Sequence, residues 1–195
     1  MSLQYFPSTS SSGGGGGALT FISKTTISDD SSVEIASGID STYFIYKFVF
    51  SEIVVGTNGA HLQVDFSTDG GTSYGETKTT AAWYLQNDTT AGMAFWSSGS
   101  LADSTSAQSI SAGAGNGTGE NTGGELTLFN PSSTTYQKLF VSQLQSTSQQ
   151  FNDNSTQISV TGTIETSSAI DAVKFSMTSG NVDAGNIILY GLKDS

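Results

Sequence analysis

The sequence predicts an all-β fold in which two antiparallel sheets pack as a β-sandwich with almost no helix. Apolar and polar residues alternate with a period of two, most clearly in HLQVDFST (61–68) and TQISVTGTIET (156–166); this is the pattern of strands that bury one face. Turn-forming segments separate the candidate strands at intervals of roughly ten to fifteen residues. Apolar residues at helical spacing are absent. Together these patterns are typical of β-sandwich proteins.

The first half of the chain contains the strongest strand signal, TYFIYKFVFSEIVV (42–55). This segment is long, aromatic and β-branched, which is strand composition. Its alternation places Phe48 and Phe50 on one face and Lys47 and Val49 on the other. Two shorter candidates precede it, ALTFISKT (18–25) and SSVEIAS (31–37).

A predicted turn and a second clear strand follow. GTNGA (56–60) predicts a hairpin turn, because Asn and Gly tolerate the positive φ that tight turns need. In the strand at 61–68 we expect the apolar side chains to face inward and Gln63 and Asp65 to face outward. Glu52 and Asp65 would then approach each other across one hairpin.

The rest of the chain repeats this theme. SAGAGNGTGENTGG (111–124) is too rich in glycine for a regular element and predicts a loop. The remaining candidate strands are TAAWYLQN (80–87), AGMAFWSS (91–98), ELTLFNP (125–131), YQKLFVSQLQ (136–145), TQISVTGTIET (156–166), DAVKFSMTSG (171–180) and GNIILYGL (185–192).

The alternation also predicts the core and the domain organisation. Residues 1–17, with glycines at 13–17, form a flexible arm, and residues 18–195 form a single β-sandwich domain. The side chains expected to be largely buried are Phe48, Phe50, Leu62, Val64, Phe66, Leu128, Phe140, Ile158, Val160, Phe175 and Leu189.

Composition excludes several classes of function. The chain carries 17 acidic residues against six lysines, has no arginine, and has a formal net charge of −11. We therefore expect no nucleic-acid partner and no anionic-membrane partner, since both are recognised by basic patches. There is no cysteine, which excludes disulfides and cysteine-ligated metals.

Four candidate sites each have a simpler structural interpretation. STDGGTSYGE (67–76) resembles a calcium loop, but only Asp69 and Glu76 are acidic, so a hairpin turn is favoured over a metal site. SGNVDAG (179–185) is interpreted in the same way. His61, the single histidine, is expected at a half-exposed strand end and not in a catalytic triad. Paired carboxylates of a glycosidase are also not favoured. We expect no catalytic residue, no metal and no cofactor.

Aromatic residues gather around the middle of the chain. Trp83, Tyr84, Phe95 and Trp96 have core packing as their simplest interpretation. Aromatic side chains also bind sugars and dominate protein interfaces. We therefore keep Trp83 and Trp96 as candidate interface residues.

Four segments carry a resemblance to a known group of proteins. They are SGIDSTYFIYKFVF (37–50), LQVDFSTDGGTSY (62–74), LTLFNPSSTTYQKLF (126–140) and SSAIDAVKFSMTSGNVDAGNIILYGL (167–192). They resemble small structural proteins of tailed bacteriophages, especially marine phages of cyanobacteria. The resemblance implies a jelly-roll-like sandwich and a non-enzymatic virion component on the outer surface of the particle, either a capsid decoration or a tail or fibre part.

The arm lies outside this resemblance, and its role is predicted from its residues. Leu3, Tyr5, Phe6 and Pro7 are expected to dock on a neighbouring virion protein, either the major capsid protein or a tail protein. A tail with no partner is the alternative. We further expect a homotrimer or lattice-bound copies. A receptor- or glycan-binding module of a tail or fibre remains the alternative function.

Overall fold

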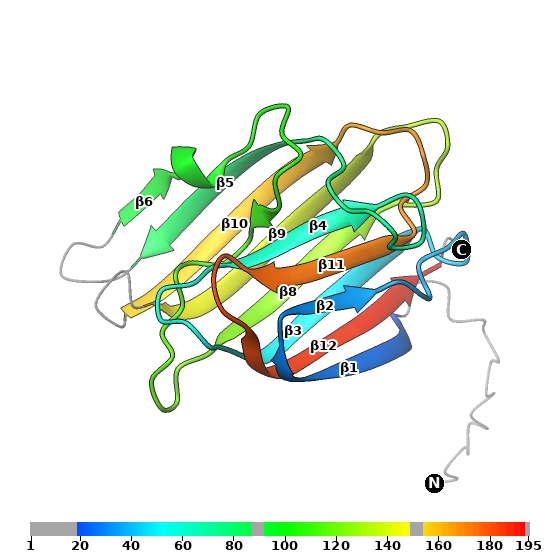
Figure 1. Ribbon diagram of the computed structural model, residues 1–195. Helices are drawn as coiled ribbons and strands as arrows, with labels where there is room; N and C mark the ends of the chain where they lie inside the picture. The colour runs from blue at the N-terminus through cyan, green and yellow to red at the C-terminus, as the bar shows by residue number, and fades with distance from the viewer. Residues whose placement is uncertain (1–18, 87–91, 149–153, 194–195) are drawn as a thin grey trace, which may run out of the picture.

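The structure is a computed structural model that describes residues 19–86, 92–148 and 154–193 (Figure 1). A single 3-10 turn, η1 (Ser97–Gly99), is the one helical element in the described parts of the chain. The strands, in chain order, are β1 (Thr20–Asp30), β2 (Ser32–Ile35), β3 (Ile45–Val55), β4 (Leu62–Ser67), β5 (Lys78–Gln86), β6 (Gly92–Phe95), β7 (Gln108–Ser109), β8 (Thr122–Phe129), β9 (Lys138–Ser148), β10 (Asn154–Ile164), β11 (Ala172–Met177) and β12 (Val182–Leu192).

The strands form two sheets that pack face to face. The large sheet has the order β1-β12-β3-β8-β9-β10-β5-β6, and the small sheet has the order β2-β11-β4-β7. Every pairing is antiparallel. In Figure 1 the small sheet lies in front of the large one, with β6 and β1 at the opposite edges of the large sheet. The predicted antiparallel two-sheet β-sandwich is confirmed.

Aromatic side chains from both sheets interlock between the layers. Phe175 on β11 lies edge-on to Phe48 and Phe50 on β3, with ring centroids 5.4 and 5.1 Å apart. Phe66 on β4 meets Phe140 on β9 at 5.2 Å. All eleven side chains that the alternation assigned to the core are buried, none more than 2% exposed. Period-two alternation therefore identified a buried face correctly on the strands that carry these residues, β3, β4, β8, β9, β10, β11 and β12.

The predicted hairpin at 56–60 is wrong in its topology. The segment does turn, with Gly59 at φ +80°, but it connects β3 in the large sheet to β4 in the small sheet. Glu52 and Asp65 therefore lie on strands of different sheets, and the carboxylate pair across one hairpin does not form. Asp65, expected to face solvent, is only 7% exposed. Strand pairing is set by non-local contacts that a turn motif alone does not specify.

The glycine-rich segment 111–124 is more ordered than the sequence predicted. Its last three residues, 122–124, begin strand β8. Its first residues pack into the interior, where Ala112 and Ala114 join the core cluster. A Cβ on Gly113 would lie 2.8 Å from the carbonyl oxygen of Gly59. The glycines here permit close packing of one loop against another, and not only flexibility.

Gly124 is expected to be intolerant of substitution. It has φ +146°, and a Cβ there would collide with the backbone carbonyl of Gln143 on the neighbouring strand. We expect Gly124→Ala to lower the free energy of unfolding by about 2–3 kcal/mol, because strained φ adds to a collision with backbone that cannot rotate away. Urea unfolding measures the change.

Gly70→Ala is the matched control for Gly124→Ala. Gly70 also has positive φ, +71°, but a Cβ there meets nothing within 4 Å. Its substitution should cost only about 1 kcal/mol, the conformational part alone. Equal costs for the two variants would contradict the proposed collision.

Candidate interaction surface

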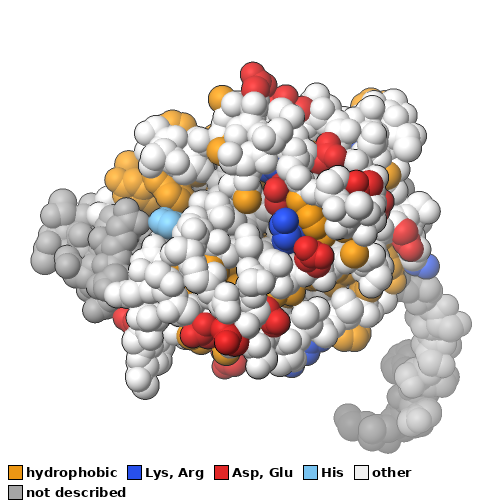
Figure 2. All heavy atoms as spheres, viewed as in Figure 1, with side chains coloured by type: hydrophobic (Ala, Val, Ile, Leu, Met, Phe, Trp, Pro, Cys, Tyr) orange, Lys and Arg blue, Asp and Glu red, His pale blue; other side chains and the backbone are white. Residues whose placement is uncertain are grey.

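The outer face of the large sheet is the candidate surface. On β9 the inward residues are Phe140 and Leu144, whereas Leu139 and Val141 point outward and are 54% and 40% exposed. Strand β9 pairs with β8 on one side and with β10 on the other, β10 pairs with β5, and β5 pairs with β6. The outward side chains of these five strands therefore form one continuous face. In the view of Figures 1 and 2 this face points away from the reader, because the small sheet is in front.

Four apolar side chains cluster at one end of this face, on β5 and β6. Trp83 is paired in register with Phe95, and Leu85 with Met93. The Trp83 and Phe95 rings meet edge-on at 5.9 Å. Trp83 is 38% exposed, Leu85 50%, Met93 73% and Phe95 54%. We call these four residues the edge patch.

Two hollows lie between the edge patch and the middle of the sheet. One of about 400 Å³ is lined by Leu85, Met93 and the amides of Gln145 and Gln157, among others. The other, of about 280 Å³, lies further along β9 and β10. Its outward lining side chains include Gln143, Ser159 and Thr161. Apart from Glu125, the polar side chains that line these hollows are uncharged amides and hydroxyls.

The candidate surface carries almost no net charge. Glu125 on β8 is the one charged outward side chain on the described parts of β8, β9, β10, β5 and β6. It pairs with Lys47 on β3, with Nζ 2.9 Å from Oε1. Figure 2 shows acidic side chains scattered over the opposite, small-sheet side of the molecule. Since the whole chain has a net charge of −11, the charge is concentrated away from the part of the outer face that β8, β9, β10, β5 and β6 form.

The two candidate tryptophans lie in different surroundings. Trp83 belongs to the edge patch, whereas Trp96 is partly buried and packs against the core cluster. The Trp96 ring stacks on His61 at 5.3 Å, and its ring lies against Gly99, where any Cβ would overlap it. Hydrophobic side chains gather beside the pale-blue His61 in Figure 2. Only Trp83 therefore belongs to the outer face of the large sheet.

His61 is held by structural contacts. Its ring Nδ1 lies 2.9 Å from the carbonyl oxygen of Ser111, and its backbone amide donates to Thr178 Oγ1. The residue is half-buried just before β4, as predicted for a strand end. These contacts tie the buried loop after β7 to the start of β4.

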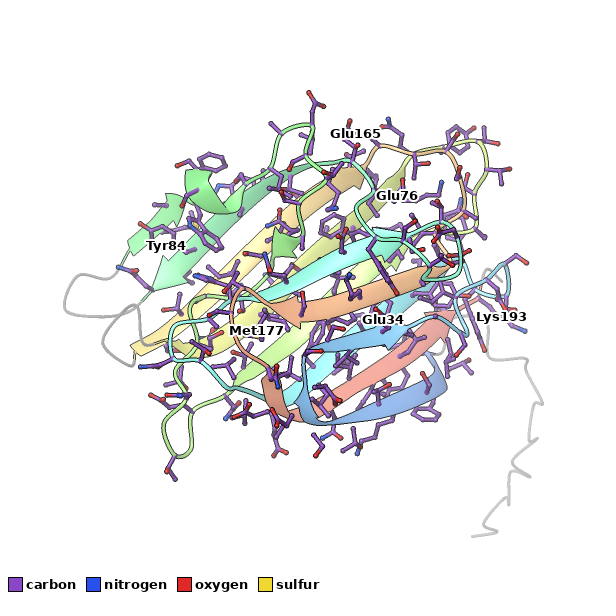
Figure 3. The ribbon with its side chains drawn as sticks, viewed as in Figure 1. Glu34, Glu76, Tyr84, Glu165, Met177 and Lys193 are labelled. Atoms are coloured by element: carbon purple, nitrogen blue, oxygen red, sulfur yellow. The ribbon has the colours of Figure 1, made fainter. Side chains whose placement is uncertain are left out.

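The edge patch contains residues that sequence reasoning missed. Leu85 and Met93 were not singled out, and Phe95 was grouped with Tyr84 and Trp96 as a core element. Tyr84, labelled in Figure 3, packs against the core cluster from β5. Both alternating sets of residues in β5 include apolar side chains. Since only one face of the strand points into the core, this pattern indicates that the other set lies on the outer face of the sheet.

The loop at 67–76 forms a tight turn around Asp69. Asp69 Oδ1 accepts hydrogen bonds from the Ser73 amide and from Ser67 Oγ, and Oδ2 accepts one from Ser73 Oγ. These hydrogen bonds lower the pKa of Asp69 to about 2, and the bonds from Ser73 have the largest effect. Within the described residues, no group of three or more acidic or histidine side chains is arranged to hold a metal ion.

EDTA is expected to leave the melting temperature nearly unchanged. The Asp69 oxygens are already engaged by serine donors from the same loop, and calcium normally requires several carboxylates. Thermal unfolding with EDTA and with added calcium measures this. A large drop in melting temperature that calcium restores would contradict the interpretation of this loop as a metal-free turn.

A buried ion pair lies close to this loop. Lys78 Nζ donates to Asp65 Oδ1 and to the carbonyl oxygen of Glu76, both at 2.7 Å. The side chain of Lys78 is fully buried, and that of Asp65 is 9% exposed. Lys138, also buried, donates to the carbonyl oxygens of Tyr136 and Thr166, and burial lowers its pKa. These lysines are structural groups inside the sandwich.

The arm residues Leu3, Tyr5, Phe6 and Pro7 lie outside the described residues. In the part of the chain that the structure describes, no helix is long and apolar enough to cross a membrane. Comparison with protein-family models, with curated proteins and with solved structures yields no match.

Proposed function

We propose that the protein is a non-enzymatic structural subunit of a tailed-phage particle, a capsid decoration or cement protein on its outer surface. The observation that supports this most is the outer face of the large sheet, which exposes the edge patch together with Leu139 and Val141. Soluble monomers rarely expose contiguous apolar patches of this kind, so a neighbouring molecule is expected to cover it.

The sequence resemblance and the charge agree with such a location. An acidic chain without arginine suits an outer position and not contact with the packaged genome. The partners are then the major capsid protein or a tail protein, with further lattice-bound copies of this chain. The fold contributes a sandwich whose outer face over β8, β9, β10, β5 and β6 carries one charged side chain, Glu125, which is paired with Lys47.

Residues 1–17 supply the proposed attachment. Tyr5 and Phe6 are the kind of side chain that anchors interfaces, and Pro7 stiffens the backbone beside them. The glycines at 13–17 span at most about 16 Å when extended. That reach is enough to contact an adjacent subunit.

Deletion of residues 1–12 tests the attachment. The free domain should keep its free energy of unfolding within about 0.5 kcal/mol of wild type, because no described core residue is removed. Incorporation into particles should fall severely. Full occupancy by the truncated protein would refute the attachment role of the arm. Counting copies in purified particles tests the location, since hundreds indicate decoration and about a dozen or fewer indicate a tail or fibre.

A receptor- or glycan-binding module of a tail or fibre is the second candidate. The observation that favours it is the row of hollows on β9 and β10, which Gln143, Gln145 and Gln157 help to line. Trp83 lies on the next strand, paired in register with Ser159 of the same row. Sugars are commonly bound by amides beside an aromatic ring. Binding of the purified protein to host cells or host glycans, lost in Trp83→Ala, would support this function over decoration.

A further inference from the structure

The two edges of the large sheet differ in how they are protected. A free strand edge exposes unpaired amides and carbonyls, and proteins usually protect it with charges, proline or bulges. The β1 edge has such protection: a bulge between Phe21 and Ser23, Lys24, and the acidic pair at 29–30. The β6 edge has the sequence Gly-Met-Ala-Phe, with no charge and no proline.

The edges of the small sheet are also protected. Strand β2 carries Glu34, and β7 is only two residues long. Among the described residues, β5 is the only strand that pairs with β6. All four residues of β6 are exposed. The unprotected edge is therefore the one that adjoins the edge patch.

We propose that β6 pairs antiparallel with β6 of a second copy of this chain about a twofold axis. The two large sheets then become one continuous sheet across the contact. A twofold axis perpendicular to the sheet keeps both outer faces on the same side. The two edge patches then lie side by side on that face, and the Met93 and Phe95 side chains of the two β6 strands contact each other across the axis. An isologous contact of this kind closes on itself and needs only one surface.

Charge favours a second copy as the occupant. Two chains of net charge −11 repel one another wherever their acidic surfaces meet. Trp83, Leu85, Met93 and Phe95 are all uncharged, and the nearest part of the outer face is lined by glutamine and serine. The β6 edge is thus a place where two acidic copies meet without like-charge opposition, gaining backbone hydrogen bonds and apolar burial together.

The absence of cysteine makes the geometry directly testable. Met93→Cys, in the full chain, should form a disulfide-linked or bis-maleimide-linked dimer, because the two copies of residue 93 lie on adjoining short strands. Tyr136→Cys is the control, since Tyr136 is 71% exposed but lies in the β8–β9 connection. Equal cross-linking of the two variants would overturn the proposal.

Sedimentation equilibrium of full-length wild-type protein should show a reversible dimer. Met93→Glu should weaken the dimer at least about tenfold, because it places like charges at the contact. Tyr136→Glu adds the same charge elsewhere and should leave the dimer constant unchanged. Far-UV circular dichroism of both variants should match wild type. A wild-type monomer at high concentration, or association that Met93→Glu does not weaken, would overturn the proposal.

A variant lacking residues 1–17 distinguishes another occupant of the same edge. If the arm covers β6, its removal should strengthen association or expose the edge to host proteins or glycans. Unchanged dimerisation of the truncated chain supports the proposed contact. All of these measurements use free protein, so their outcome is separate from particle incorporation, which tests the proposed function.

Discussion

Asp65→Ala is expected to lower the free energy of unfolding by about 3–5 kcal/mol, because it leaves the buried Lys78 ammonium without its counter-charge. Lys78 Nζ lies 2.7 Å from Asp65 Oδ1 and is shielded from solvent. Its other hydrogen-bond acceptor is the carbonyl oxygen of Glu76. Asp65 also accepts a hydrogen bond from the Phe66 amide, which the alanine variant loses. Urea unfolding monitored by tryptophan fluorescence measures the change.

The double variant Asp65→Leu with Lys78→Met separates charge from packing. Replacing both partners by apolar groups removes the uncompensated ion, so it should be much less destabilising than Asp65→Ala alone. Glu125→Ala breaks the Lys47–Glu125 pair, in which both side chains are partly exposed, and should cost less than about 1 kcal/mol. If Asp65→Ala lowered the free energy of unfolding no more than Glu125→Ala, the Asp65–Lys78 pair would have to be accessible to water in solution.

Phe48→Ala is also expected to cost about 3–5 kcal/mol, the range for truncating a buried phenylalanine. The Phe48 side chain is fully buried on β3 and lies 5.4 Å from the ring of Phe175 in the opposite sheet. Its removal therefore opens a cavity between the two sheets and removes a contact that joins them. Neighbouring strands are fixed by backbone pairing on both sides, so the cavity should collapse little.

The matched control for Phe48→Ala is an exposed aromatic residue. Phe95→Ala removes the same side chain from β6, where it is 54% exposed, and should change the free energy of unfolding of the monomer by less than about 1 kcal/mol. A cost below about 1 kcal/mol for Phe48→Ala would show that Phe48 is not in the core. Measurement at low protein concentration keeps self-association from contributing.

The candidate surface was predicted only in part. Trp83 and Phe95 were recognised as a group with Tyr84 and Trp96, but the side on which each lies was not predicted. In YQKLFVSQLQ both alternating sets contain apolar residues. The sequence pattern correctly placed Phe140 in the core, but it did not predict that Leu139 and Val141 form an exposed surface. Pairing with β8 and β10 turns Phe140 inward and Leu139 outward. When both alternating sets of a strand are apolar, the contacts with neighbouring strands decide which set faces the core.

The sequence by itself determined the strand class, the near absence of helix and one buried face of most strands, because side-chain alternation is a local property of extended backbone. The tertiary structure alone decided that β4 leaves the sheet of β3, that Asp65 meets Lys78, and that the edge patch forms beside an unprotected edge. Each of these depends on contacts between residues distant in sequence. Such contacts are chosen by the packing of the whole domain, and a local pattern of two-residue period does not contain that information.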